Sequence, residues 1–369
     1  MNGMKKSGRK TSSFGRKIII SIIVILIVLI FCVLFMGHSY LKASLKPLNS
    51  NNHSKIQIDV PMGASDRKIG SILQNQNIVR SGMVFNYYVK AHNISDFRAG
   101  YYELSPSMSL QQIANILRRG GSSLPLKTSY GKIVVSEGSS INQLANNVQN
   151  NSRFSSTNFI DLMKNRNFAN QLKKKYPELL TSSMKSKRTR YPLEGYLYPA
   201  VYSADNGISM EQMVESMVSK ENGALKPYYS RMKKEHLSVQ QTLTLASLIE
   251  KQNLNSERNR ELVAGILLNR IDNKMHLNSD TSVLYALNKF KRKLNQKDLK
   301  NNSPYNLYKY IGYGPGPFNN PGLNSIKAVL YPKKRDQGYL YFIVNPKNGK
   351  LLLAKNSLEQ QNNAKKVSK

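Results

Sequence analysis

The longest uninterrupted run of apolar residues lies near the amino terminus, from Ile18 to Met36, and is interrupted only by Ser21. As a helix this run would span about 29 Å at roughly 1.5 Å per residue, which matches the hydrocarbon core of a bilayer. Lysine and arginine, but no acidic residue, precede it, so the positive-inside rule keeps this end cytoplasmic. We predict a cytoplasmic tail over residues 1–17, a single membrane-spanning helix over residues 18–36 and export of the rest to the cell surface.

A cleaved signal peptide is the alternative interpretation of this segment. The apolar part of a signal peptide usually spans about 7–15 residues and ends at a cleavage site of small residues. Here the apolar run is longer, and Gly37-His38-Ser39-Tyr40 follows it. A retained anchor is therefore favoured, and residues 37–54, which are polar and turn-rich from Leu45 onward, are predicted to form a linker.

Beyond the linker, a pattern of a β-rich end, a small turn and an amphipathic helix recurs three times. The copies span residues 60–73, 104–117 and 135–148. Each helix has apolar residues at helical spacing and begins after a serine that is a suitable N-cap. These serines are Ser65, Ser109 and Ser140. The last two also fit a capping box, with Gln112 and Gln143 as partners. The uneven spacing of the copies predicts a few related β-turn-α units rather than a solenoid.

The segment SVQQTLTLASLIEKQ predicts a strong helix with Ser238 as its N-cap. Leu243 and Ala246 precede Glu250 by seven and four positions, so the carboxyl group shares their apolar face. A glutamate on a surface helix is normally solvated, whereas burial disfavours the charged form of a carboxyl group. We therefore predict that Glu250 holds a proton near neutral pH, as a general acid must. The apolar stretch over residues 262–268 predicts a second, buried helix.

Loops rich in Gly, Pro, Asn and Tyr follow these two helices. They cover residues 275–280, 303–308 and 312–322. Loops commonly present binding groups, and Tyr and Asn suit stacking on sugar rings and hydrogen bonding to hydroxyl and acetamido groups. Turn formation explains the same residue types equally well, so both interpretations stay open.

Composition constrains the location of the protein more than its chemistry. The net charge of +34 is typical of proteins that bind polyanions, which for an exported domain are lipid headgroups and wall polymers. No helix-turn-helix, zinc spacing or RNA-binding signature indicates nucleic acid. The single cysteine, Cys32, lies in the apolar run, which excludes a disulfide from the exported part. Zinc-protease, phosphate-loop and serine-hydrolase motifs are also missing, the last despite Ser279-Asp280 close to His276, so neither a metal nor a cofactor is expected.

Several short motifs occur in order through the second half of the chain. They are Leu193-Glu194-Gly195-Tyr196-Leu197-Tyr198-Pro199, Ala246-Ser247-Leu248-Ile249-Glu250-Lys251, Gly265-Ile266-Leu267-Leu268-Asn269-Arg270, Ser279-Asp280, Tyr305-Asn306-Leu307-Tyr308 and Pro315-Gly316-Pro317. With these motifs the chain, from about Ile56 to its carboxyl end, resembles the bacterial endolytic lytic transglycosylases of the MltG/YceG type. Any one motif alone would be weak, whereas the ordered set is highly specific.

The resemblance implies an α+β fold, with a small LysM-like β/α domain over residues 55–125 and a YceG-like mixed α+β catalytic domain over residues 126–369. It implies cleavage of peptidoglycan glycan strands between MurNAc and GlcNAc, leaving 1,6-anhydroMurNAc ends, by one catalytic glutamate that maps onto Glu250. The expected substrate-binding residues are Glu194, Ser279, Asp280, Tyr305, Asn306, Tyr308 and Asn320. Of these, Glu194 is expected to position the substrate or to shape the site. Peptidoglycan synthases and the division or elongation machinery are the expected protein partners.

Six residues, at four places in the chain, depart from the family's pattern. Gln252 replaces a second glutamate after Glu250-Lys251, Ala200-Val201 replace Asp-Thr, Thr281 replaces a proline, and Gln360-Gln361 stand near a usual Glu/Ser-His pair. The change at position 252 removes a negative charge that would raise the proton affinity of Glu250. A non-catalytic, membrane-anchored peptidoglycan-binding scaffold is the alternative function, and it would not need a carboxyl group on an apolar helix face.

Overall fold

The computed structural model describes residues 22, 26, 31, 35–125, 128–252, 254, 256–289, 293–345 and 348–368. The predicted cytoplasmic tail and most of the predicted membrane-spanning segment lie outside this part of the chain. Within it, no helix has the length and apolar character needed to cross a bilayer. Residues 37–44 of the predicted linker are helical, because Leu41, Lys42 and Ala43 are strong helix formers, and residues 45–54 form turns and bends.

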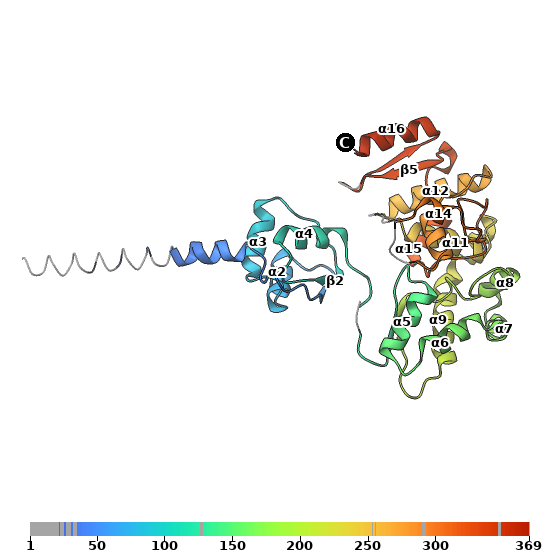
Figure 1. The fold of residues 1–369 in the computed structure, drawn as a ribbon, viewed down its shortest axis with the longest axis horizontal. Helices are drawn as coiled ribbons and strands as arrows, with labels where there is room; N and C mark the ends of the chain where they lie inside the picture. The colour runs from blue at the N-terminus through green and yellow to red at the C-terminus, as the bar shows by residue number, and fades with distance from the viewer. Residues whose placement is uncertain are drawn as a thin grey trace, which may run out of the picture. The chain divides into compact units, whose positions relative to one another are not determined.

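The chain forms two compact units, residues 1–123 and 124–369, which are described separately. The first contains β1 (Ile56–Val60), α2 (Asp66–Asn75), α3 (Gly82–Ala91), β2 (Gly100–Leu104) and α4 (Leu110–Arg119). The two strands pair antiparallel, with Ile56 opposite Leu104, and α2 packs against α3 (Figure 1). Apolar side chains from all five elements, including Ile58, Leu73 and Phe85, form one buried core.

The N-caps predicted from the three repeats are confirmed. The Ser65 hydroxyl accepts from the backbone of Lys68, and both predicted capping boxes are formed, at Ser109 and at Ser140. The third copy lies in the second unit, where β3 (Lys132–Val135) precedes α5 (Ile141–Asn151). Its strand pairs antiparallel with β4 (Ala200–Ser203).

Helices dominate the second unit. Besides β3, α5 and β4 it contains α6 (Ser156–Lys164), α7 (Arg166–Lys175), α8 (Pro177–Lys185), α9 (Met210–Leu225), η1 (Lys226–Tyr228), α10 (Tyr229–Lys234), α11 (Val239–Glu250), α12 (Glu257–Asp272), α13 (Asp280–Ala286), α14 (Gln296–Leu299), α15 (Leu323–Leu330), η2 (Arg335–Gln337), β5 (Tyr341–Val344), β6 (Leu351–Ala354) and α16 (Ser357–Ser368). Every sheet in the described part of the chain is a two-stranded antiparallel pair. The predicted α+β class is confirmed.

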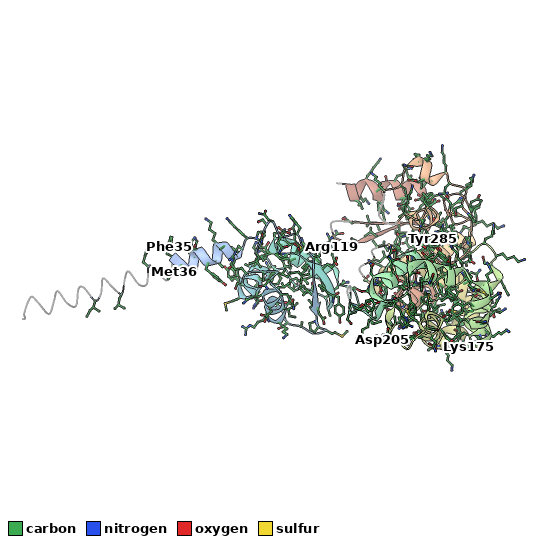
Figure 2. The ribbon with its side chains drawn as sticks, turned by 60° about the horizontal axis from the view of Figure 1, so that its bottom comes forward. Phe35, Met36, Arg119, Lys175, Asp205 and Tyr285 are labelled. Atoms are coloured by element: carbon green, nitrogen blue, oxygen red, sulfur yellow. The ribbon has the colours of Figure 1, made fainter. Side chains whose placement is uncertain are left out.

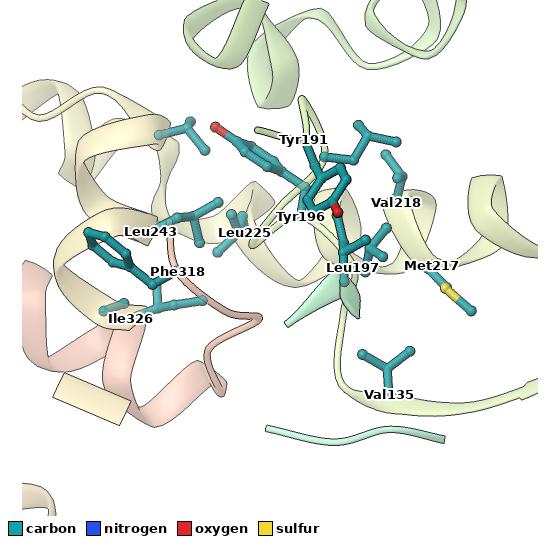
Figure 3. Packing of buried hydrophobic residues seen from close by; sticks show 14 of the residues in the cluster. Val135, Tyr191, Tyr196, Leu197, Met217, Val218, Leu225, Leu243, Phe318 and Ile326 are labelled. Carbon is teal, nitrogen blue, oxygen red and sulfur yellow. The ribbon is translucent and has the colours of Figure 1, made fainter. Parts of the chain in front are cut away.

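The centre of the second unit is α11, which packs against α8, α12 and α15. It begins at the predicted N-cap, Ser238, whose capping box with Gln241 is formed. Leu243 and Ala246 are fully buried, and Figure 3 shows Leu243 close to Ile326 of α15 and to Phe318. Charged side chains such as Lys175 project from the edge of the unit (Figure 2). Packing on several sides therefore fixes the end of α11, where Glu250 lies.

The second predicted helix, over residues 262–268, is also confirmed, because Val263 and Ala264 of α12 are fully buried. The Asn269 side chain at the end of this stretch donates to the carbonyls of Arg335 and Tyr339. The Arg270 guanidinium donates to the carbonyls of Leu277 and Leu340. These two polar residues therefore hold the segment that leads into β5.

Candidate active site

Glu250 is the last residue of α11, and its side chain is half-buried. Its Oε2 atom accepts two hydrogen bonds, from the backbone nitrogen of Gly322 at 3.1 Å and from the Ser325 hydroxyl at 2.6 Å. Gly322 is the N-cap of α15, so the carboxylate lies at the positive end of that helix dipole. Oε1 has no hydrogen-bond partner in the described part of the chain. One oxygen is thus held by the protein, and the other is free to exchange a proton.

A purely structural explanation of Glu250 is that it caps α15. Capping accounts for the two donors on Oε2, since the first-turn donors of a helix need acceptors. It does not account for Oε1, which has no hydrogen-bond partner in the described part of the chain, or for the position of Glu250 next to Lys251, which lines three clefts. The geometry therefore suits an acid or base better than a cap alone.

A second carboxylate, which the motif analysis missed, lies close to the first. Glu137 is in the turn between β3 and α5, and a methyl group placed on Gly322 would come within 2.4 Å of its Oε1 atom. Burial and the negative charge of Glu250 raise the pKa of Glu137, and Arg260 opposes this shift. Gly322 therefore separates two carboxyl groups, one of which binds its nitrogen.

The turn that carries Glu137 also contacts α11. Gly138 has φ +73°, in the left-handed region that favours glycine, and a Cβ there would lie 3.1 Å from Lys251 Nζ and 3.4 Å from Glu250 Cγ. Burial lowers the pKa of Lys251, while Glu250 raises it. The sequence did contain a signal for Glu137: among the three repeats, only the third has an acidic residue in its turn.

Three adjoining clefts open beside these residues, and Lys251 lines all of them. One, of about 270 Å³, is lined by Glu137 and Gly138. A second of similar volume is lined by Gly138, Asp280 and Phe318. The third, of about 500 Å³, is lined by Asp280, Ser279 and Tyr308, among others. Shared walls make these clefts one candidate groove for an extended ligand.

The predicted binding residues at the surface meet in the third cleft. Asp280 is exposed, and its Oδ1 atom accepts from the Tyr308 hydroxyl at 2.6 Å. Burial raises the pKa of Tyr308, and the hydrogen bond to Asp280 and the charge of Asp280 raise it further. The Tyr308 hydroxyl therefore keeps its proton and acts as a hydrogen-bond donor. Ser279 lines the same cleft and is 5% exposed, and its hydroxyl has no partner among the described residues. Asp280 and Tyr308 can therefore contact a ligand directly, whereas the Ser279 hydroxyl is buried in the wall of the cleft.

A larger cleft, of about 720 Å³, lies elsewhere in the described part of the chain. It is lined by Ser238, Gln240 and Gln241 at the amino end of α11 and by residues around Tyr310. Ser238 and Glu250 stand at opposite ends of this helix, which places them roughly 18 Å apart. Volume alone therefore does not identify the site of the chemistry, and the clefts around Lys251 are the better candidates.

Glu194 is 2% exposed and binds only protein groups. Its Oε1 atom accepts from the backbone nitrogen of Ile141, the first residue of α5, at 3.0 Å, and Oε2 accepts from the Tyr285 hydroxyl at 2.9 Å. Burial raises the pKa of Glu194 to about 7, against the opposing effects of both hydrogen bonds and of Arg190. The carboxyl group joins α5 to α13. This geometry favours the site-shaping role over direct contact with substrate.

Three further predicted binding residues are buried. The Tyr305 hydroxyl accepts from the backbone nitrogen of Arg190 at 2.9 Å, and burial raises the pKa of this tyrosine to about 12. Asn306 donates to the carbonyls of Leu299 and Asn301. At these two positions the structure favours loop formation over recognition of sugars.

Asn320 connects the two halves of the site. Its Oδ1 atom accepts from the backbone nitrogen of Leu197 at 3.1 Å, and its Nδ2 donates to the carbonyl of Ser139 at 2.9 Å. Ser139 follows the turn that carries Glu137, so this buried amide holds that turn against the segment 193–199. The role is to support the site rather than to contact a ligand.

Three of the family departures lie in or next to the site region, and one of them, Thr281, lines both the second and the third cleft. Gln252 is partly exposed and lines the 500 Å³ cleft, two residues after Glu250. Gln360 donates from Nε2 to the carbonyl of Phe342, which attaches α16 to β5. No group of three or more His, Cys, Asp or Glu residues in the described part of the chain is arranged to bind a metal ion.

Known proteins resemble this chain in sequence and fold. Residues 58–366 match the YceG-like family. The chain is 37% identical to an endolytic murein transglycosylase of Bacillus subtilis over 336 residues, which is 90% of each protein. It is 34% identical to an endolytic murein transglycosylase of Streptococcus pneumoniae over 89% of this chain, and it spans only 61% of that relative's length. A crystal structure of a yceG-like protein from Listeria monocytogenes has a TM-score of 0.59 and 35% identity, covering 84% of this chain and 99% of that one.

Proposed function

The chain belongs to the YceG-like family, and on that premise we propose that it is an endolytic peptidoglycan lytic transglycosylase whose acid and base is Glu250. One observation supports the choice of residue above all others. Glu250 is a half-buried carboxyl group with Oε2 held by Gly322 and Ser325 and with Oε1 unbound in the described part of the chain, and the next residue, Lys251, lines three adjoining clefts. A proton on Oε1 can then reach a substrate while the side chain keeps its position.

One carboxyl group serves both halves of the proposed reaction. Glu250 donates a proton to the glycosidic oxygen, and the bond between that oxygen and the anomeric carbon of the muramyl residue breaks. The C6 hydroxyl of the same residue attacks the anomeric carbon, forms the 1,6-anhydro bond and returns its proton to Glu250. No water is consumed, so the enzyme needs no second carboxylate as nucleophile or as base for water, unlike a glycoside hydrolase.

We assign direct contact with the glycan to Asp280 and Tyr308, because their side chains line the groove and are accessible. Ser279, whose hydroxyl is buried, is assigned to the wall of the groove. Glu194 and the buried group Tyr305, Asn306 and Asn320 are assigned to support of the site. In this proposal Glu194 fixes the start of α5, and with it the orientation of the turn that faces Glu250.

The proposal places the enzyme at the cell membrane, with residues 18–36 as a single-pass anchor and the catalytic unit outside. Residues 55–125 are proposed to act as a LysM-like module that binds the same wall polymer. The positive net charge suits a position between anionic lipid and anionic wall polymers. Peptidoglycan synthases and the division or elongation machinery remain the proposed partners.

The test of this function is a product analysis. The full-length chain, solubilised in mild detergent, is incubated with uncrosslinked peptidoglycan glycan, and the products are examined by mass spectrometry for internal cleavage and anhydromuramyl ends. We expect shortened strands with such ends. A substrate that a control lytic enzyme cleaves but this chain leaves intact would refute the proposal and favour a non-catalytic, peptidoglycan-binding scaffold.

A further inference from the structure

The turn Ser136–Ser139 holds a carboxylate, Glu137, that lies close to Glu250, and the single-glutamate mechanism gives it no role. Glu137 and Glu250 approach the same glycine from two sides: Glu250 accepts from the nitrogen of Gly322, and the Glu137 carboxyl group lies against its Cα. Any side chain at position 322 would collide with Glu137 Oε1, Cδ and Cγ. The site is thus shaped so that two carboxyl groups can approach each other.

The position of Glu137 is set by the structure around its turn. The backbone nitrogen of Gly138 donates to the carbonyl of Asn320 at 2.7 Å, and the nitrogen of Asn320 donates to the carbonyl of Ser139 at 2.9 Å. The Asn320 side chain adds a third hydrogen bond to Ser139. These bonds tie the turn to the loop that leads into α15. The bonds therefore fix the backbone that carries Glu137 relative to Gly322.

Two neighbouring carboxyl groups do not both ionise easily, because each negative charge disfavours the other. The charged neighbours of the pair that the structure describes include Lys251 of α11 and Arg260 of α12, and the charge of Arg260 opposes the rise in the pKa of Glu137. Tyr198 also faces Glu137, and burial, Glu221 and Glu137 raise the pKa of this tyrosine. On α15, the backbone nitrogen of Gly322 and the Ser325 hydroxyl both donate to Glu250 Oε2. Among these described neighbours, only the second carboxyl group opposes loss of a proton from the pair through its negative charge.

We propose that Glu137 is a positioning residue that acts through Glu250, keeping a proton on the pair so that Glu250 is still an acid at neutral pH. This inference rests on the proposed function and deepens it. In this chain Glu137 also provides a negative charge close to Glu250, while position 252, where the family pattern has a glutamate, is Gln.

The test compares the pH dependence of kcat in wild type, Glu137→Gln and Glu137→Asp. Removing the charge of Glu137 stabilises ionised Glu250, so the alkaline limb of the profile should move to lower pH by about one unit, a tenfold loss of proton affinity. At pH 7.5 kcat should fall about 5–10-fold with KM unchanged. In the Glu137→Asp variant the alkaline limb should lie close to its wild-type pH. Glu211→Gln, on the exposed first turn of α9, is the matched control and should keep the wild-type profile.

A limb that stays at the wild-type pH in Glu137→Gln would overturn the proposal, and so would a rise in KM alone, which would indicate contact with substrate. The proposed function is judged separately, by whether wild type produces anhydromuramyl ends and Glu250→Gln does not. If wild type produces none, the titration of the Glu250 carboxyl carbon by ¹³C NMR still decides the role of Glu137. The resonance is assigned by its loss in Glu250→Gln, and its midpoint must fall in Glu137→Gln.

Discussion

Glu250 and Glu194 are both in family motifs, yet the protein surrounds them differently. Glu194 is almost completely buried, and each of its oxygens accepts a hydrogen bond from a group of the protein. Glu250 is half-buried, and both of its bonds converge on one oxygen. The first arrangement satisfies the carboxyl group and leaves nothing for a ligand. The second restrains the side chain and leaves one oxygen able to react.

Burial alone therefore does not identify a catalytic acid. Burial raises the pKa of Glu194 to about 7, a value suited to acid catalysis, but no substrate can reach this carboxyl group. Glu221 is a second example: burial raises its pKa to about 8, and it lies in the interior of α9. Access to one free oxygen is the more informative property.

The largest effect is expected from Glu250→Gln. The amide oxygen can still accept from Gly322 and Ser325, so the fold should be kept and the melting temperature should change by no more than about 2 °C. The loss of the acid should reduce kcat by about 10³-fold, within the range of general acid catalysis. Release of anhydromuramyl ends measures the first effect and thermal denaturation the second.

Glu194→Gln is the matched variant for this comparison, and it should retain far more activity than Glu250→Gln. If both variants abolish activity equally while both remain folded, the proposed division between a reacting and a supporting carboxyl group is wrong.

The second prediction concerns stability and pH at Glu194. Its pKa is about 7 in the folded protein and near 4.5 in the unfolded chain, so the folded state binds more protons between these values. The stabilising effect is complete below about pH 4.5 and is lost as pH rises through 7, a change of about 3 kcal/mol in the free energy of unfolding, or roughly 10² in the equilibrium constant. Urea denaturation at pH 5 and pH 8 should show this loss in wild type but not in Glu194→Gln. Parallel pH dependence in the two proteins would contradict it.

The sequence could predict α11 and its reactive residue because that information is local. Ser238, the apolar positions at helical spacing and Glu250 lie within one short segment, so periodicity and capping rules are sufficient. The helix boundaries of the three repeats were predictable for the same reason. Local rules apply wherever the decisive contacts are a few residues apart.

The partners of Glu250 could not be predicted in this way. Ser325 is 75 residues later in the chain, and Glu137 comes from a turn whose approach to α15 depends on hydrogen bonds to Asn320. The predicted sugar-binding role of Asn306 illustrates the same limit. An amide can bind a sugar or a backbone carbonyl with the same atoms, and only its complete burial favours the second use.

The third prediction weakens the restraint on Oε2 without removing the acid. Ser325 is fully buried and donates its hydroxyl proton to Glu250, so Ser325→Ala removes one of two bonds. A hydrogen bond to a charged group is worth about 1.5–3 kcal/mol, and part of it is present in both the ground and the transition state. We expect kcat to fall about 10-fold, with a smaller change in KM. Ser325→Thr keeps the hydroxyl group and serves as the control, and a wild-type kcat in Ser325→Ala would show that Gly322 alone positions the carboxylate.

The smallest effect should come from Gln252→Glu, which restores the charge found in the family pattern. Position 252 is partly exposed on the wall of the 500 Å³ cleft, so solvent and salt screen a charge there more than one in the turn that carries Glu137. The alkaline limb of the pH profile should rise by less than about 0.5 unit at low ionic strength, which is at most about a threefold change in proton affinity, and the shift should shrink in 0.5 M salt. In a Glu137→Gln background the same substitution should move the alkaline limb only part of the way back to its wild-type pH. Complete restoration would mean that any nearby negative charge suffices and that the position of Glu137 against Gly322 has no special importance.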